Sequence, residues 1–245
     1  MIMKVYIQVN KNNEFFNVNA YVANAGFLHL GYEVVKYFTY KDIEDAIPED
    51  IVVGGIANVR GHLKRLGFVQ NKEEIDYPKE LKNYFGRKIW SDNLQNVFND
   101  ESQRNIFIKP KETKIFNGLV VKDFKDFIGL DVSIENEIWC SEPINFLTEW
   151  RCFVRYGKLL DVRYYKGFWN QKLDTEIVEK AIQDFKSAPA AYCLDFAIDE
   201  KGKYYLVEVN DGHSLGSYGM GDVSYAKFIS ARWAELTSTK DYLNF

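Results

Sequence analysis

In the first 70 residues, short β-type runs of hydrophobic and polar positions alternate with segments that have the spacing of an α-helix. Residues 4–9, 32–38 and 50–55 are short runs of β-forming side chains, which predicts three strands. Between them, apolar side chains recur at helical spacing over residues 18–28 and 59–66, with Asn17 as the N-cap of the first helix and a glycine after each. This alternation predicts a small α/β unit with a partly parallel sheet. Gly54 and Gly55 end the third strand, where they either make a simple turn or let a ligand approach the backbone.

Short strands dominate the rest of the chain. We expect strands at 105–110, 119–121 and around 138–140, and a short helix at 94–98 that Asp92 opens. A hairpin over 149–155 and 158–165 precedes an amphipathic helix over 175–187, a second hairpin over 194–199 and 203–209, and a last helix over 225–236. The polar stretch 71–78 resembles a linker. We therefore predict two domains, an α/β domain over 1–84 and a second domain over 85–245.

The second hairpin brings polar side chains together. A two-residue loop at Lys201-Gly202 fixes a register in which Asp195 faces Glu208, and Asn210 shares the face of Glu208 because strand side chains alternate. Opposed carboxylates destabilise a sheet unless a cation lies between them, and oxygen ligands of these types suit Mg²⁺. The alternative is a solvated acidic strand edge. The magnesium interpretation is favoured by the apolar side chains that give the same strands a buried face: Leu194, Phe196, Val207 and Val209.

Composition narrows the classes of function. Hydrophobic residues make up 47% of the 245 residues and charged residues 27%, as in ordinary globular proteins. The net charge of −4 does not support a nucleic-acid-binding surface. No apolar run reaches the length of a membrane span, and the start does not resemble a signal peptide, so we expect a cytoplasmic protein. Three scattered cysteines do not form a disulfide framework, and the pattern gives no indication of the oligomeric state.

Two lysines lie where an anion can bind. Lys109 ends a buried strand, and Lys114 precedes the turn Phe116-Asn117-Gly118, whose N–H groups can also hold an anion. Each lysine alone is typical of a solvated surface. Together with a downstream magnesium site they indicate a protein that handles a nucleoside triphosphate. The chain has no GxxxxGK[ST] motif and no GxGxxG after its first strand, which excludes a P-loop and gives no support for a dinucleotide fold.

In this order, the motifs resemble those of an ATP-grasp domain. They are Phe-Ile-Lys109-Pro, Lys114 before its glycine turn, Glu-Trp-Arg151, Asp195 and Glu208-Val-Asn210, and the similarity covers roughly residues 85–240. The most similar clade is the small one named for an arginine and two lysines. The resemblance implies a Rossmann-like N-terminal unit followed by an ATP-grasp domain, which consists of two α+β halves with antiparallel sheets. It also implies a hinge near 137–143.

The resemblance further implies roles for individual residues. Phosphates of ATP would be bound by Lys109 and Lys114, and adenine by Trp139 and Cys140 of the hinge strand, with Glu142 at the ribose. Asp195, Glu208 and Asn210 would hold one or two Mg²⁺. Many relatives carry an arginine two residues before the first metal-binding Asp, where this chain has Cys193. The transition-state charge would therefore be stabilised by Arg151, Arg163 and Lys114.

The implied activity is that of an ATP-dependent carboxylate–amine ligase. A small-molecule or peptide carboxylate would attack ATP, and an amine would then convert the acyl phosphate to an amide, with release of ADP and phosphate. Backbone N–H groups of the loop at Gly212, His213 and Ser214 would bind the substrate and the oxyanion, and His213 is either a base or an ordinary surface histidine. The alternatives are an ATP-grasp kinase for a small molecule and a non-catalytic nucleotide-binding module.

Overall fold

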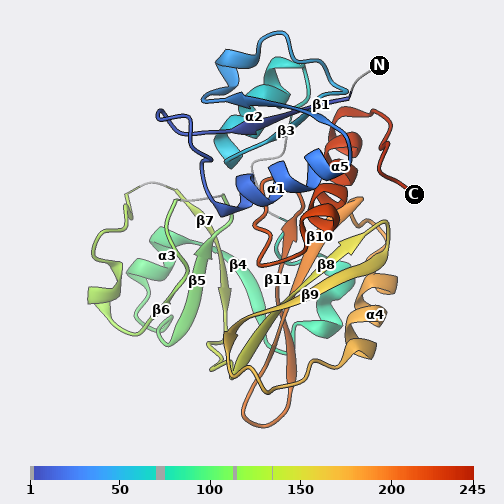
Figure 1. Cartoon of the computed structure of the whole chain (residues 1–245). Coiled ribbons are helices and arrows are strands. Elements are labelled where there is room, and N and C mark those ends of the chain that lie inside the picture. The colour runs from blue at the N-terminus through green and yellow to red at the C-terminus, as the bar shows by residue number, and fades with distance from the viewer. Residues whose placement is uncertain (1–2, 70–74, 113–114, 134) are drawn as a thin grey trace.

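The computed structural model describes residues 3–69, 75–112, 115–133 and 135–245. In this part of the chain the strands form three separate sheets, seen in Figure 1 as a sheet at the top, a lobe at the lower left and a larger sheet at the lower right. Within the described ranges, no helix combines the length and the apolar character that a membrane span requires.

The N-terminal sheet is parallel. Its strands are β1 (Lys4–Gln8), β2 (Glu33–Tyr37) and β3 (Ile51–Val53), in the order β2-β1-β3. The connecting helices are α1 (Val18–His29) and α2 (Ile56–Arg65), and Asn17 caps α1 by accepting the N–H of Ala20 at 3.0 Å. The short 3-10 helix η1 (Tyr40–Ile43) precedes β3. The predicted strand–helix alternation is therefore present.

The left-hand lobe in Figure 1 is an antiparallel sheet of order β4-β7-β5-β6. It contains β4 (Ile89–Asn93), β5 (Ile106–Pro110), β6 (Leu119–Val121) and β7 (Glu137–Ser141), with α3 (Leu94–Asn99) and η3 (Phe124–Phe127). Strand β4 was not predicted from the sequence. The predicted cap of α3 was one residue early, since Asn93, not Asp92, accepts the N–H of Gln95. The preceding helix η2 (Lys79–Tyr84) packs on the third sheet through Leu81.

The third sheet is also antiparallel, in the order β11-β10-β8-β9. It consists of the two predicted hairpins, β8 (Thr148–Arg155) with β9 (Lys158–Gly167), and β10 (Ala191–Ile198) with β11 (Tyr204–Asp211). Helix α4 (Thr175–Asp184) and η2 cover one face. Helix α5 (Asp222–Thr237) covers the other. The antiparallel sheets predicted for the second part of the chain are confirmed.

Helix α5 joins the third sheet to the N-terminal sheet. It lies beside α1 in Figure 1, and one apolar core contains Phe27 of α1, Phe153 of β8 and Phe228 of α5. The helices cross closely at Gly26, where a Cβ atom would lie 2.1 Å from the carbonyl oxygen of Asp222. The N-terminal unit is therefore packed directly onto the sheet that carries Asp195 and Glu208.

Candidate active site

The register of the β10–β11 hairpin places Asp195 opposite Glu208, as predicted. The loop that sets this register differs from the prediction. It has three residues instead of two, and its last residue, Gly202, has a φ of 78°. That loop pairs Phe196 with Leu206, one residue out of the predicted register, and a β-bulge at Val207 restores the pairing at Asp195. Without the bulge, Glu208 would lie opposite Leu194, on the other face of the sheet.

Arg87 holds the bulge from outside the sheet. Its Nη1 donates to the carbonyl oxygen of Leu206 at 2.9 Å and its Nη2 to that of Val207 at 3.0 Å. The guanidinium lies 5.9 Å from the ring centres of Tyr77 and Phe146. Sequence reasoning missed Arg87, because nothing local shows that an arginine before β4 reaches a bulge 120 residues later.

Asp195 is almost completely buried and forms a bidentate ion pair with Arg151, its neighbour on β8. Arg151 Nε lies 2.8 Å from Asp195 Oδ1, and Nη2 lies 2.6 Å from Oδ2. Burial raises the pKa of Asp195 to about 6, and the guanidinium limits this rise, so the carboxylate is ionised at neutral pH. The ring centre of Tyr218 lies 4.4 Å from the guanidinium of Arg151.

Lys109 approaches Glu208, the strand partner of Asp195, from the other lobe. Its Nζ on β5 lies 2.7 Å from Glu208 Oε2 and 2.6 Å from Asp76 Oδ1. Burial alone would lower the pKa of Lys109, but the carboxylates of Glu208 and Asp76 outweigh burial and raise it. Burial would raise the pKa of Glu208, and Lys109 outweighs it, so the pKa is lowered. Lysine and carboxylate are therefore both charged.

Asp76 is a residue that the sequence placed wrongly in a linker. Residues 71–74 of that stretch lie outside the described residues, but Asp76 is 2% exposed and Tyr77 is 8% exposed. The carbonyl oxygen of Asp76 accepts the N–H of Val209 at 2.8 Å, which joins this segment to the edge strand β11. From its charge, the side chain of Asp76 was expected to be exposed to solvent. The backbone hydrogen bond to β11 instead holds it in a buried position beside Lys109.

Asn210 completes the group on β11. Its Nδ2 donates to Glu208 Oε1 at 3.0 Å and lies 3.4 Å from Asp195 Oδ2. If the Asn210 amide rotates by 180°, its Oδ1 takes the position of Nδ2 beside Asp195 and Glu208. The three predicted metal ligands therefore meet at one point of the sheet, with Arg151 and Lys109 on either side of them.

The loop after β11 is held by a second charged network. Asp211 accepts from Arg232 of α5 through both of its oxygens, and its Oδ1 lies 2.7 Å from His213 Nδ1. Burial would raise the pKa of Asp211, but Arg232 and His213 outweigh it and lower the pKa. Arg60 of α2 donates through Nε to His213 Nε2 at 3.3 Å. The loop thus connects the N-terminal unit with the strand that carries Glu208.

A cavity of about 370 Å³ lies between these groups. Its wall includes Lys109 of β5, Glu208 and Asn210 of β11, and His213 and Ser214 of the loop. The turn Phe116-Asn117-Gly118, which was predicted to hold an anion, lies on the same wall. The structure therefore brings residues from both lobes and from the loop to a single charged cavity.

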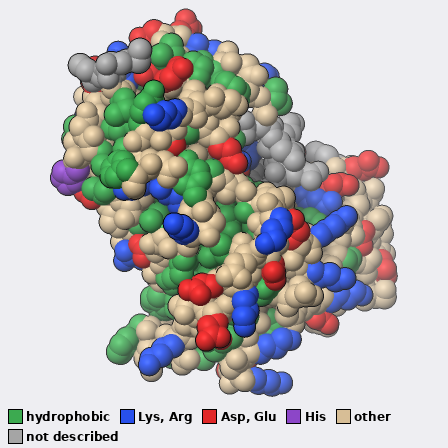
Figure 2. Space-filling view, turned by 90° about the vertical axis from the view of Figure 1, so that its right-hand side faces the viewer, with side chains coloured by type: hydrophobic (Ala, Val, Ile, Leu, Met, Phe, Trp, Pro, Cys, Tyr) green, Lys and Arg blue, Asp and Glu red, His purple; other side chains and the backbone are tan. Residues whose placement is uncertain are grey.

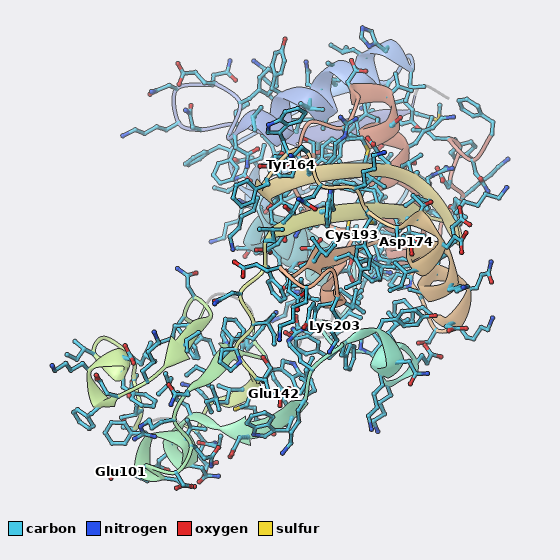
Figure 3. All side chains as sticks on the ribbon, turned by 90° about the horizontal axis from the view of Figure 1, so that it is seen from below. Glu101, Glu142, Tyr164, Asp174, Cys193 and Lys203 are labelled. Atoms are coloured by element: carbon cyan, nitrogen blue, oxygen red, sulfur yellow. The ribbon has the colours of Figure 1, made fainter. Side chains whose placement is uncertain are left out.

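Among the other predicted site residues, Arg163 and Glu142 do not line this cavity. Lys114 lies outside the described residues. Arg163 is the strand neighbour of Arg151, but its guanidinium pairs with Asp161 at 2.6 Å. Glu142 lies between the lobe that carries Glu101 and the sheet that carries Cys193 (Figure 3), where its carboxylate accepts the N–H of Lys88 at 3.0 Å.

The backbone of the predicted hinge strand is paired within its sheet. Strand β7 lies between β4 and β5, so the backbone of Trp139 and Cys140 belongs to a sheet that is paired on both sides. The side chain of Cys140 is buried in the core of the lobe, and burial raises its pKa to about 12. The ring of Trp139 is half-buried, with Lys111 Nζ 4.9 Å from its centre. Backbone contacts to adenine would therefore have to come from residues after the strand.

Comparison with known structures shows the same fold in several ligases. The D-alanine–D-alanine ligase from Bacillus anthracis complexed with ATP is 16% identical with a TM-score of 0.61, and the similarity covers 97% of this chain and 99% of that one. N5-carboxyaminoimidazole synthetase from Staphylococcus aureus complexed with ADP is 11% identical, with 98% and 79% covered and a TM-score of 0.60. An L-amino acid ligase from Bacillus licheniformis is 12% identical, with 96% and 75% covered and a TM-score of 0.56.

Sequence comparison identifies the family. No curated protein sequence matches the chain significantly. The matching family model describes an ATP-grasp domain, family 2 of the clade named for an arginine and two lysines, and it covers residues 84–228, more than half of the chain. The chain therefore belongs to this clade of the ATP-grasp proteins.

Proposed function

We propose that this chain is an ATP-dependent carboxylate–amine ligase that forms an amide or peptide bond through an acyl phosphate and releases ADP and phosphate. The observation that carries the proposal is the meeting of Lys109, Glu208 and Asn210 on the wall of one charged cavity of an ATP-grasp fold. The ion pair of Arg151 and Asp195 lies next to Glu208 on the same sheet. The names of the structural neighbours, which include two amino-acid ligases, support ligase chemistry.

In the proposed site, Lys109 and Arg151 exchange some of their hydrogen bonds to carboxylates for hydrogen bonds to phosphate oxygens when a triphosphate binds. Lys109 and Arg151 now neutralise Glu208 and Asp195, and both can turn part of their hydrogen bonding to phosphate oxygens. Lys114 belongs to the same proposal through its place in the motif. The exchange would keep every buried charge compensated, which limits its free-energy cost.

The donor set fits a magnesium ion. Asp195 and Glu208 offer carboxylate oxygens and Asn210 an amide oxygen, and Mg²⁺ in such sites is held by one or two carboxylates together with substrate phosphates. Among the described residues no group of three or more His, Cys, Asp or Glu side chains could hold a metal alone, which agrees with a site that the nucleotide completes. When bound, the ion would neutralise charge on the transferred phosphoryl group.

In the proposed reaction a substrate carboxylate oxygen bonds to the γ-phosphorus as the bond to ADP breaks. Arg151 and Lys109 stabilise the phosphoryl charge in this step, and no protein nucleophile is needed. An amine then attacks the acyl carbon, loses a proton and displaces phosphate. His213 can accept that proton only if Nε2 gives up its hydrogen bond from Arg60.

The loop offers fewer oxyanion donors than its sequence had indicated. The Gly212 N–H donates to the Ala191 carbonyl at 3.1 Å, and the His213 N–H to Asp211 Oδ1 at 3.0 Å. Within the part of the chain that the structure describes, the Ser214 N–H has no protein acceptor, and Ser214 lies on the cavity wall. The proposal therefore assigns the oxyanion contact to Ser214.

An isotope experiment tests the acyl phosphate. A candidate carboxylate donor labelled with ¹⁸O should transfer one ¹⁸O atom to the released phosphate, and only when MgATP and an amine are present. Screening amino acids, dipeptides and polyamines for ADP release would first identify the pair of substrates. A product that retains the γ-phosphate, with no free phosphate formed, would instead indicate a kinase.

Glu208→Gln is the preferred variant for this test. Asp195 is buried against Arg151, so its replacement would leave a buried guanidinium unpaired, whereas the Glu208 side chain is 27% exposed. We expect Glu208→Gln to lower ADP release by at least about 100-fold while the thermal unfolding curve stays two-state. Glu80→Gln, the same substitution at an exposed site on η2, should leave the rate unchanged. Full activity of Glu208→Gln would contradict the proposed site.

A further inference from the structure

A second cavity of about 230 Å³ lies directly beside the charged one. The two share His213, Ser214 and Leu215 of the loop and Ile56 of α2, which form their common wall. The second cavity extends from there towards the end of β3, the start of α1 and the inner face of α5. A molecule that reacts at Glu208 and Lys109 could therefore extend past His213 into the N-terminal unit.

The second cavity is lined by several apolar side chains. Phe16, Val53, Val59, Ile229 and Trp233 come from four different parts of the chain. Among the described residues that line it there is no Asp, Glu, Lys or Arg, whereas the neighbouring cavity has several of each sign. A charge placed in the second cavity would lose part of its hydration without an Asp, Glu, Lys or Arg side chain on the wall to compensate it.

Several polar side chains of this cavity form hydrogen bonds within the protein. Asn19 Oδ1 accepts from the N–H and the hydroxyl of Ser217, at 2.9 Å and 3.1 Å. The hydroxyl of Tyr225 donates to the Leu215 carbonyl, and Trp233 Nε1 donates to the Pro48 carbonyl at 3.0 Å. These residues therefore present mainly their carbon surfaces to the cavity.

We infer that the second cavity binds an uncharged apolar side chain of one of the two ligase substrates. The inference rests on the proposed function for the identity of the reacting groups. A cavity of roughly 150 Å³ with apolar walls suffices for benzene, so this one accommodates a side chain as large as leucine, methionine or phenylalanine. The substrate class is thus an amino acid or peptide residue with an apolar side chain, whose reacting end lies in the charged cavity.

The binding step can be tested without turnover. The protein is labelled with 5-fluorotryptophan, and the Trp233 resonance is assigned from the spectrum of Trp233→Phe. We expect N-acetyl-leucine amide to shift the Trp233 ¹⁹F resonance saturably, at a concentration at least tenfold lower than N-acetyl-aspartate amide requires. No shift, or equal shifts with both compounds, would overturn the inference even if ATP chemistry were demonstrated.

Variants at Val59 test the size of the cavity in both directions. Val59→Phe should weaken binding of N-acetyl-leucine amide at least tenfold, and Val59→Ala should favour the larger N-acetyl-phenylalanine amide. Val69→Phe, an exposed site in the same unit, is the matched control and should change neither. Unchanged binding in a folded Val59→Phe would contradict the inference, and if that variant does not fold, the Val59→Ala comparison and the wild-type titration decide.

Turnover then shows which substrate carries the apolar group. N-acetyl-leucine with hydroxylamine offers only a carboxylate for activation, while leucine amide offers only an amine. If ADP release depends on N-acetyl-leucine, the carboxylate donor carries the apolar group. If leucine amide stimulates ADP release, the amine acceptor carries it. A preference for aspartyl over leucyl substrates in both arms would overturn the inference, whereas absence of MgATP binding would contradict the proposed function alone.

Discussion

At the scale of single residues, the carboxylates of the site, whether buried or partly buried, are each paired with a cation. Asp195 has Arg151, while Glu208 and Asp76 share Lys109. Such pairs are costly to break, because the remaining charge stays buried without a partner. A residue that is expected to bind ATP, such as Lys109, therefore also stabilises the folded protein. If its replacement lowers activity, the stability of the variant has to be measured as well.

Lys109 provides such a case. We expect Lys109→Met to lower the free energy of unfolding by about 3 kcal/mol, because the two carboxylates beside Nζ lose their cation. Adding Asp76→Asn removes one of these charges and should restore part of the stability. ATP affinity, measured by titration calorimetry, should stay low in both variants. Recovery of ATP binding in the double variant would show that Lys109 has only a structural role.

At the scale of elements, the β-bulge at Val207 decides which face of the sheet Glu208 occupies. Bulges often redirect a side chain beside a functional site. Here Arg87 donates to the carbonyl groups of the two peptides that flank the bulged residue Val207, those of Leu206 and of Val207 itself. Arg87 is therefore a positioning residue, since it acts on the proposed magnesium site only through the backbone of β11.

We expect Arg87→Met to raise the Mg²⁺ concentration for half-maximal ADP release roughly tenfold, because Glu208 would no longer be fixed opposite Asp195. Arg87→Lys, which can still donate to one carbonyl, should have an intermediate effect. Arg104→Met is the control, because Arg104 also donates to backbone carbonyls but in the other lobe. An equal effect of Arg104→Met would mean that general destabilisation, and not the bulge, explains the result.

At the scale of the whole molecule, the N-terminal unit and the third sheet share one apolar core through α5. The domain limits predicted from sequence, 1–84 and 85–245, stay a proposal. On the face shown in Figure 2, Lys and Arg side chains are interspersed with Asp and Glu side chains over the molecule. His62 of α2 lies inside the shared core, where its ring stacks on Trp233 of α5 with 6.1 Å between centres.

His62 should make stability depend on pH. Neither of its ring nitrogens has a hydrogen-bond partner among the described residues, and burial, aided by Arg65, lowers its pKa to about 4. The unfolded chain then binds a proton below pH ~6.5 that the folded chain does not. Stability is therefore complete above pH ~6.5 and falls by up to roughly 3 kcal/mol as the pH decreases towards 4.

Urea unfolding at a series of pH values measures this effect. His62→Phe keeps an aromatic ring against Trp233 but cannot titrate, so its stability should fall less between pH 6.5 and 4 than that of the unaltered protein. His29→Phe, at an exposed position, should retain the full dependence. Identical slopes for His62→Phe and the unaltered protein would show that other groups dominate.

The sequence by itself determined most of the elements and the order of the charged residues that they carry. Periodicity and turn residues gave both hairpins and the parallel unit, because local backbone preferences and side-chain alternation suffice for these. The order of Lys109, Arg151, Asp195 and Glu208-Val-Asn210 along the chain was enough to indicate the ATP-grasp family, which the family match confirms.

Only the tertiary structure decided how these elements meet. The hairpin register at Asp195 depends on a bulge that compensates a longer loop, and the bulge in turn depends on distant Arg87. Asp76 appeared to be a solvated linker residue and is buried beside Lys109. The backbone of β7, which was expected to contact adenine, is paired with a strand on either side. The physical reason is that burial and ion pairing join groups far apart in the chain, whereas periodicity reports only on neighbours.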